Sequence, residues 1–315
     1  MTLLILSSEK DLTADFLIVE LISRGLPYFR LNSEDLAKAQ YAYRASSGGV
    51  TCEIALGPKS INISDVNAVW YRRAITPMPM ANMPPGQRQF VAGELRHLAA
   101  GLAMNTDALW VNPIDRVSAA EHKLYQLSLA HDLGFRVPRT LVTRDWCELR
   151  QFASENLGGT ICKPIYHGLF IEGASRYSIY TRRVDPNTLD ADSVDPCPVL
   201  LQEEIRRVAD VRVTIIGTKC YVADITGANG LIDWRDPAEA VEYSVSRLSD
   251  EMLGRCRAMM ERLGLIYGAF DFIRTPDGGL VFLEVNPTGE WAWLENKLGF
   301  PIRDAFIQTF FGEPR

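Results

Sequence analysis

The sequence lacks the marks of several common protein classes. Its six cysteines all lie more than four residues apart, so paired zinc ligands and a redox Cys-x-x-Cys motif are absent. The net charge is −6 and no polybasic run occurs, which argues against sequence-independent binding to nucleic acid. No stretch approaches the roughly 18 apolar residues of a membrane span. We therefore expect no nucleic-acid partner and no membrane partner.

The start of the sequence also lacks the features of a secretory signal. Met1–Ser8 is apolar but short, and acidic Glu9 and Asp11 follow it. No basic segment precedes it and no cleavage site follows, so it indicates a first β-strand and not a signal peptide. The cysteines are accordingly interpreted as reduced thiols in a cytoplasmic protein.

What the sequence does contain is typical of a globular α/β protein. Its 315 residues suffice for two or three lobes with a large core, and 47% hydrophobic and 23% charged residues are ordinary values. A buried strand at Leu3–Leu6, helical spacing over Asp11–Ser23 and a second strand at Pro27–Leu31 form a βαβ opening. This opening indicates a small parallel α/β domain.

Turn and composition signals divide the chain into three regions, 1–114, 115–198 and 199–315. The first boundary lies near Asn112-Pro113, and the Asp- and Pro-rich stretch Asp185–Pro198 is interpreted as a surface connection. We expect further helices at Gln87–Met104, Val117–Leu133, Asp145–Asn156 and Ser249–Leu263. Further strands are expected at Tyr41–Ala45, Val50–Leu56, Ala68–Arg73, Ala108–Val111, Pro138–Val142, Thr160–Pro164, Tyr177–Thr181, Val199–Gln202, Val211–Gly217, Lys219–Thr226, Tyr267–Arg274 and Leu280–Val285.

The strongest chemical signal is a hairpin near the C-terminus. Pro276–Gly279 has the composition of a hairpin turn, so Asp271 should lie opposite Glu284 on the partner strand. Asn286 lies two residues beyond Glu284 and shares its face. Two carboxylates and an amide oxygen on one face form a site suited to Mg²⁺. The alternative is a solvent-facing pair, but the apolar residues around both acids do not show the alternation it requires.

Two lysines are candidate phosphate ligands. Lys163 ends a buried strand before a glycine-bearing loop, Tyr166–Ser175, and could reach nucleotide phosphates as a point charge. Lys123 lies in the helix after Asn112-Pro113. Taken alone, each lysine is more simply explained as a solvated residue at a strand end or on a helix surface. The functional interpretation of the two lysines therefore depends on the other motifs of the predicted site.

A strand followed by an acidic turn suggests where a nucleotide base and ribose would bind. Gln202-Glu203-Glu204-Ile205 offers backbone donors and acceptors to an adenine edge, and Asp210 could take ribose hydroxyls. Taken alone, this is a common strand–turn–strand pattern. Arg212 and Arg235 are candidate donors to a phosphate or acyl group during transfer.

The whole chain resembles the ATP-grasp superfamily in the order of its motifs. That order is two lysines, an acidic hinge, an arginine and then Asp…Glu-x-Asn. The resemblance implies ATP held between two sheets. It assigns Lys123 and Lys163 to the phosphates, Glu203, Glu204 and Ile205 to the adenine pocket, Asp210 to the ribose, and Asp271, Glu284 and Asn286 to magnesium.

A narrower resemblance rests on three segments. Val69–Arg73, Asp233–Arg235 and Asn286–Glu295 are similar to the microviridin-type peptide maturases, or graspetide synthetases. That family links Asp or Glu side chains of a ribosomal precursor peptide to Ser, Thr or Lys, and its members suggest a homodimer. Glu290 departs from the glutamine expected there. Arg72 would then recognise an acidic side chain or acyl phosphate, although a solvated strand end is the simpler alternative.

We therefore predict an ATP-dependent ligase that activates a carboxylate as an acyl phosphate. Mg²⁺, the two lysines, Arg212 and Arg235 would offset the repulsion between two anions. No histidine is plainly placed as a base, although His167 is possible, so ester and amide formation both stay open. Two alternatives are a ligase resembling the ribosomal-protein glutamate ligases and a non-catalytic ATP-binding module.

Overall fold

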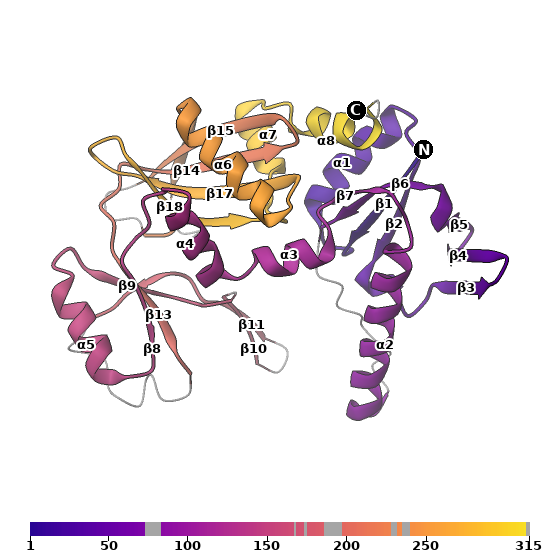
Figure 1. Ribbon diagram of the computed structural model, residues 1–315, viewed down its shortest axis with the longest axis horizontal. Helices are drawn as coiled ribbons and strands as arrows, with labels where there is room; N and C mark the ends of the chain where they lie inside the picture. The colour runs from indigo at the N-terminus through magenta and orange to yellow at the C-terminus, as the bar shows by residue number, and fades with distance from the viewer. Residues whose placement is uncertain are drawn as a thin grey trace.

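A computed structural model describes residues 1–72, 83–166, 168–172, 175–185, 197–227, 232–234 and 240–312. The described residues form a mixed α/β fold with a parallel sheet near the N-terminus and antiparallel sheets in the rest (Figure 1). The α/β class expected from the sequence is confirmed.

The N-terminal region is an open parallel sheet with helices α1 (Leu12–Ser23) and α2 (Pro85–Ala103). Its strands pair in the order β2-β1-β6-β7, with bounds β1 Thr2–Ser7, β2 Tyr28–Asn32, β6 Val66–Tyr71 and β7 Leu109–Val111. An antiparallel sheet adjoins it, made of β3 Gln40–Ser46, β4 Gly49–Leu56 and β5 Lys59–Asn62, with short 3₁₀ turns at Ser33–Asp35 and Ile63–Asp65.

Side-chain caps explain where two of the helices begin. Asp11 accepts a hydrogen bond from the Ala14 backbone N–H and starts α1, and Ser249 accepts one from Met252 and starts α6 (Asp250–Leu263). Gly264 ends α6 with a left-handed φ of 67°, a conformation that glycine adopts without the Cβ clash of other residues. These ends lie close to the positions predicted from the sequence.

Two short helices connect the N-terminal region to the rest. The single helix predicted over 117–133 is wrong, because α3 (Ile114–Ala120) and α4 (Lys123–Asp132) are separated at Glu121 and His122. His122 has an extended backbone, and the break lets α3 pack on α6 while α4 packs on β18 (Leu280–Asn286). Lys123 is therefore the first residue of a helix.

The middle region is a small antiparallel sheet with one covering helix, α5 (Trp146–Glu155). Its strand order is β12-β9-β13-β8, with bounds β8 Thr140–Thr143, β9 Thr160–Lys163, β12 Arg182–Arg183 and β13 Val199–Glu203. A hairpin of β10 (Leu169–Glu172) and β11 (Ser175–Ser178) stands beside it, in place of the strand expected at Tyr177–Thr181.

The sheet pairing moves residues across the predicted region boundaries. β13 pairs with both β8 and β9, so residues 199–203 belong to the middle sheet and not to the C-terminal region. α4 contributes Leu129 and Ala130 to the core under the C-terminal sheet, although residues 115–132 were expected in the middle region. In both cases nonlocal contacts, which no local sequence signal reports, decide the membership.

The C-terminal region is a five-stranded antiparallel sheet in the order β16-β15-β14-β17-β18. The bounds not yet given are β14 Ala209–Ile216, β15 Lys219–Gly227, β16 Val241–Val245 and β17 Tyr267–Arg274. α6 covers one face with a core that includes Phe270, Phe272 and Phe282. Helix α7 (Ala292–Leu298) contacts β16 and α1, and helix α8 (Ile302–Phe311) contacts β14, α1 and β6. Phe306 of α8 packs on Trp70 of β6.

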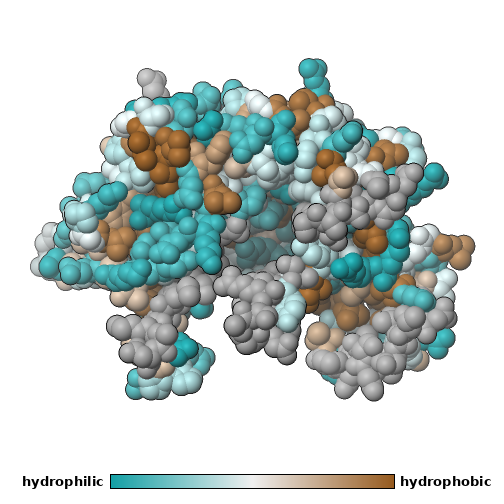
Figure 2. Space-filling model, turned by 180° about the vertical axis from the view of Figure 1, so that it is seen from behind, coloured by the Kyte–Doolittle hydropathy of each residue, from teal (hydrophilic) through white to brown (hydrophobic). Residues whose placement is uncertain are grey.

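The surface is consistent with this layered core. The face seen in Figure 2 is mostly hydrophilic, and hydrophobic residues gather on it in small separate patches. Within the part of the chain that the structure describes, no helix is both long and apolar enough to span a bilayer.

Candidate functional site

A cavity of about 530 Å³ lies between the middle sheet and the C-terminal sheet. Its volume lies within the range of roughly 300–1,000 Å³ that is usual for small-molecule and cofactor sites. The residues that line it come mainly from α4 and the two sheets, and they include Lys123, Gln126, Ile161, Lys163, Tyr180, Thr181, Leu200, Gln202, Arg207, Asp210, Asp233, Trp234, Asp271, Ile273, Leu283, Glu284, Asn286 and Thr288.

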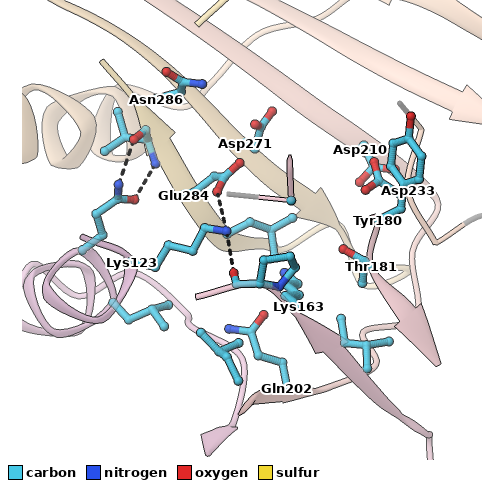
Figure 3. Close-up of a pocket in the computed structure, with 18 of the residues that line it drawn as sticks. Lys123, Lys163, Tyr180, Thr181, Gln202, Asp210, Asp233, Asp271, Glu284 and Asn286 are labelled. Carbon is cyan, nitrogen blue, oxygen red and sulfur yellow. Dashed lines mark hydrogen bonds and ion pairs between the residues drawn. The ribbon is translucent and has the colours of Figure 1, made fainter. Parts of the chain in front are cut away.

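The acidic side of the cavity comes from the predicted hairpin. Asp271 of β17 pairs with Glu284 of β18, and Asn286 pairs with Ala269, so the predicted register is confirmed. Strand alternation turns Asp271 away from the phenylalanine core under α6 and toward the cavity. Figure 3 shows Asp271, Glu284 and Asn286 together along one side.

Each of these oxygen donors is oriented by a neighbour. Arg212 of β14 lies opposite Asp271 in the ladder, and its Nε donates to Asp271 Oδ1 at 2.9 Å. Lys123 Nζ lies 3.9 Å from Glu284 Oε2. Asn286 Oδ1 accepts a hydrogen bond from the Thr288 backbone N–H at 2.9 Å.

The possible metal ligands suit a magnesium ion shared with a nucleotide better than a metal ion held by protein groups alone. Among the described residues, no group of three or more His, Cys, Asp or Glu side chains is placed to hold a metal ion. Asp271, Glu284 and Asn286 offer two carboxylates and one amide oxygen. Mg²⁺ is usually held by one or two carboxylates together with substrate phosphates, so this set suits an ion shared with a nucleotide.

Both predicted phosphate lysines line the same cavity and face its acidic side (Figure 3). Lys123 Nζ donates to the Pro164 carbonyl at 2.9 Å, which ties the start of α4 to the end of β9. Lys163 is the last residue of β9 and pairs with Leu200 of β13. The two cations therefore approach the acids from two different elements.

One end of the cavity is apolar on both sides. Ile161 and Leu200 come from the middle sheet, and Ile273 and Leu283 from the C-terminal sheet. Beside them Gln202 is buried, and its Nε2 donates to Thr140 Oγ1 at 3.0 Å. Gln202 Oε1 has no hydrogen-bond partner among the described groups. A buried acceptor without a donor is unfavourable, so this oxygen is suited to a ligand N–H.

The three residues after Gln202 do not line the cavity. Glu203 Oε1 accepts from the Arg139 backbone N–H, and Glu204 forms two hydrogen bonds of 2.7 and 2.6 Å with Arg183. Ile205 packs with Ile273 and Val281. These residues form the connection between the two sheets, and their predicted contact with adenine stays a prediction.

Asp210 lines the cavity next to a second acid, Asp233 (Figure 3). Arg207 Nη1 donates to both Asp210 oxygens, at 2.9 and 3.1 Å, and to the Ile232 carbonyl at 2.8 Å. Burial raises the pKa of Asp210 to about 6, because desolvation outweighs the opposing attraction of Arg207. Asp210 thus lines the cavity beside Ile273, its partner in the β14–β17 ladder, and its predicted contact with ribose stays a prediction.

Arg212 is buried between aromatic rings. Its guanidinium lies 5.5 Å from the Trp234 ring centre and 5.8 Å from that of Trp293, and Nη1 donates to the Glu290 carbonyl at 3.5 Å. Cation–π contacts and the bond to Asp271 therefore fix its orientation. The other predicted arginine, Arg235, lies outside the described residues, as do Arg73 and His167.

Arg72 does not line the cavity. It is buried at the end of β6, where its donors bind Asp11, Glu290, and the carbonyls of Thr288 and Gly289. A guanidinium has five N–H donors, and five such bonds are present. The predicted contact with a substrate stays a prediction, and the geometry instead gives Arg72 a role in holding the loop after β18.

The positive charge of Arg72 is balanced by the negative charges of Asp11 and Glu290. Burial alone would raise the pKa of Asp11, but the charge and hydrogen bonds of Arg72, together with Ser7 and the Ala14 N–H, hold it below its usual value. Burial opposes the charge on Arg72, yet Asp11 and Glu290 raise its pKa above the ordinary range. Glu290, which departs from the residue expected in the sequence, is thus one of two acids on a buried arginine.

Sequence reasoning missed several polar residues in and around the site, and three of them show why. Arg207 could have been found from its spacing of three residues before Asp210. Asn112 was used only as a boundary signal, although its side chain donates to the carbonyls of Tyr267 and Pro287. Gln126 gives no signal at all, because one glutamine in a polar helix is indistinguishable from a solvated residue.

Comparison with known proteins fits this geometry. Residues 1–118 match the family model of the MvdD pre-ATP grasp domain. None of the curated proteins compared with the chain matches it.

Solved structures match over the whole chain. The macrocyclase MdnC from Microcystis aeruginosa MRC, bound with precursor peptide MdnA, has a TM-score of 0.89 at 26% identity and covers 99% of this chain and 100% of its own. Macrocyclase MdnB from the same organism has a TM-score of 0.82 at 29% identity, covering 99% of both chains.

A more distant structure shares the fold. The Chryseobacterium gregarium RiPP-associated ATP-grasp ligase, in complex with ADP and a leader and core peptide, has a TM-score of 0.88 at 21% identity and covers 100% of this chain and 98% of its own. The chain therefore has the ATP-grasp fold, and its resemblance to the microviridin-type peptide maturases is confirmed.

Proposed function

We propose that this chain is an ADP-forming ligase that acts on a ribosomally made precursor peptide. It would phosphorylate Asp or Glu side chains of the peptide and join them to Ser, Thr or Lys side chains as macrocyclic ω-esters or ω-amides. The observation that carries the proposal is a cavity in which two lysines face two carboxylates and an amide. Similarity over the full length to MdnC and MdnB supports a peptide substrate.

The apolar end of the cavity suits adenine. Ile161 and Leu200 on one side and Ile273 and Leu283 on the other would enclose a flat ring between the two sheets. The buried Gln202 Oε1 is placed to accept a hydrogen bond from an amino group on that ring. Asp210 and Asp233 offer acceptors for ribose hydroxyls beside these apolar residues.

The lysines and the acids would have different roles at the phosphates. Lys123 and Lys163 would neutralise phosphate oxygens, while Asp271, Glu284 and Asn286 would hold Mg²⁺. Bound ATP would supply the phosphoryl group that turns a carboxylate into an acyl phosphate, and Mg²⁺ would neutralise charge on its phosphates. The two lysines, together with an Mg²⁺ held by the acids, would offset the repulsion between the two anions, which is how enzymes accelerate phosphoryl transfer.

Arg212 is not among the cavity-lining residues, but its bond to Asp271 supports a role during acyl transfer. Its Nε is bound to Asp271, and aromatic rings limit its movement. A fixed guanidinium stabilises developing negative charge without reorganising during the reaction. A base that would deprotonate the peptide nucleophile is not assigned, because His167 and Arg235 lie outside the described residues. A hydroxyl nucleophile needs such a base more than an amine does, so both bond types stay part of the proposal.

The remaining parts of the proposal concern partners and location. We propose a peptide partner with a leader segment and a core rich in acidic and hydroxyl residues, a cytoplasmic enzyme and a homodimer. Light scattering on the purified protein tests the dimer directly, since a monomeric mass would contradict it.

Mass spectrometry tests the activity. The protein is incubated with ATP, Mg²⁺ and a precursor peptide encoded beside its gene. Each crosslink should remove one water from the peptide and release one ADP. Addition of an amino acid mass would instead favour a ligase like the ribosomal-protein glutamate ligases. Nucleotide binding with no change in peptide mass would favour a non-catalytic module.

A further inference from the structure

The outer edge of β18 is completed by a side chain. Among the described residues β18 is the last strand of its sheet, and an isolated bridge to Arg136 at Val281 pairs one point of its outer edge. At Val285 the Gln126 carboxamide takes the place of a neighbouring strand: Val285 N donates to Gln126 Oε1 at 2.7 Å, and Gln126 Nε2 donates to the Val285 carbonyl at 2.9 Å. A carboxamide offers the same donor and acceptor as a peptide unit, so Gln126 pairs with β18 as a strand would.

Burial and a further hydrogen bond hold the Gln126 side chain in this position. Its side chain is only 3% exposed, and Nε2 also donates to the Ala120 carbonyl at the end of α3. Val285 lies between Glu284 and Asn286, the two candidate magnesium ligands of β18. The carboxamide therefore anchors α4 to the strand at the residue between those ligands.

Helix α4 also carries Lys123, the candidate phosphate ligand, about one turn before Gln126. Lys123 and Gln126 are three residues apart in α4 and so lie on neighbouring positions of one helix face. Lys123 Nζ lies 3.9 Å from Glu284 Oε2, on the strand that Gln126 binds (Figure 3). A shift of α4 along β18 would change this separation directly.

The segment after Val285 is held in the same manner. Asn112 donates to the Pro287 carbonyl at 2.8 Å, and Arg72 donates to the Thr288 and Gly289 carbonyls at 2.7 and 3.2 Å. Buried polar side chains from outside the C-terminal sheet thus fix the segment that follows Glu284. The position of the site depends on these contacts in addition to the β-ladder.

We propose that Gln126 is a positioning residue that sets the distance between Lys123 and the acids of β18. Both groups can then contact one Mg²⁺-nucleotide at the same time. The inference rests on the proposed function. It differs from a simple packing role, because a packing defect would weaken nucleotide binding equally with and without Lys123, whereas a positioning role depends on Lys123.

A double-mutant cycle separates these two roles. The affinity for the non-hydrolysable analogue AMP-PNP is measured by calorimetry, with Mg²⁺ and with EDTA, for the wild type, Q126M, K123A and Q126M/K123A. Methionine matches glutamine in length but cannot pair with Val285. We expect Q126M to weaken the Mg²⁺-dependent affinity about tenfold, in line with the loss of a buried hydrogen-bonded pair. In the K123A background the same change should weaken it less than about twofold.

Controls keep the outcome interpretable. Q151M changes an exposed glutamine of α5 whose side chain bonds to Glu155, and should leave the affinity unchanged. Hydrogen exchange should accelerate at the Val285 amide in Q126M, while the β14–β17 pairing keeps its protection. If Q126M does not fold, Q126E replaces it in the cycle, since a carboxylate still accepts from Val285 N but cannot donate to its carbonyl.

The outcomes distinguish the two proposals. Equal losses in the wild-type and K123A backgrounds, or no loss in either, would overturn the positioning role while leaving the ligase proposal intact. A wild-type protein with no Mg²⁺-dependent binding of AMP-PNP would overturn both.

Discussion

The two sheets that enclose the cavity are built very differently. Every residue of β14, in the C-terminal sheet, is buried, and the core on that side extends through four phenylalanines, α4 and α6. The core between α5 and the middle sheet is a small cluster with two buried members among the described residues, Leu149 and Leu201, and partly exposed side chains around them. Stability should therefore differ between the two sides of one site.

This difference assigns the chemistry to the rigid side. Asp271, Glu284 and Arg212 lie on the heavily packed sheet, where fixed geometry favours ion binding and charge stabilisation. Lys163 and Gln202 lie on the lightly packed sheet, which can open at lower free energy. The comparison suggests that the middle sheet admits and covers the nucleotide while the C-terminal sheet holds the reacting groups.

The largest expected effect comes from the rigid side. D271N removes a carboxylate while keeping its shape, and we expect ligation to fall by about a thousandfold, because both the ion site and the partner of Arg212 are lost. Peptide dehydration measured by mass spectrometry reports the rate. D277N, in the exposed turn of the same hairpin, is the matched control and should keep its activity. Near-normal turnover of D271N would remove Asp271 from the site.

A core deletion in the middle sheet sharpens the comparison of stabilities. L201A removes one of the two buried residues of that core, and we expect a loss of about 2–5 kcal/mol in the local opening free energy. Hydrogen exchange should accelerate in β8, β9 and β13 and stay unchanged in β14 and β17. Equal acceleration in both sheets would mean that they unfold as one unit, against the proposed division.

The third prediction concerns the cation on the lightly packed side. K163A should raise the ATP concentration needed for half-maximal ligation by about tenfold or more, because a charge-assisted contact to phosphate is lost. Initial rates over a range of ATP concentrations measure this. K219A, at an exposed strand start, serves as the control. An unchanged ATP requirement would place Lys163 outside the phosphate site.

The smallest effect is a pH dependence. The pKa of Asp210 is raised to about 6 in the folded protein, above its unfolded value of 3.8. Between these values the folded state holds a proton that the unfolded state has released, so Asp210 makes stability fall as pH rises and has no further effect above the folded pKa. Its contribution from pH 5 to pH 6 is about 1 kcal/mol.

Denaturant unfolding of the wild type and D210N at these two pH values measures the contribution of Asp210. The D210N variant should lose this part of the pH dependence. The same slope in both proteins would show that another group titrates there.

The sequence predicted what local signals determine. The Pro276–Gly279 turn fixes the β17–β18 register, so Asp271 and Glu284 could be paired from the sequence alone. The order of the two lysines and the acids then indicated the fold. These features depend on neighbouring residues or on a motif spread along the chain.

Nonlocal contacts explain what was missed. The membership of β13 in the middle sheet depends on β8 and β9, which are distant in sequence. The pairing of Gln126 with Val285 spans 159 residues and has no local mark. Arg72 looked like a strand-end donor for a ligand, but the loop after β18 occupies it, and only the packing of two regions reveals that.

A crystal structure with ADP and Mn²⁺ tests the central claim most directly. Mn²⁺ gives an anomalous signal, and like Mg²⁺ it prefers oxygen ligands. The account predicts one manganese peak within coordination distance of both Asp271 and Glu284, with the adenine between Ile161 and Ile273. Nucleotide bound outside this cavity, or a manganese peak away from both carboxylates, would contradict it.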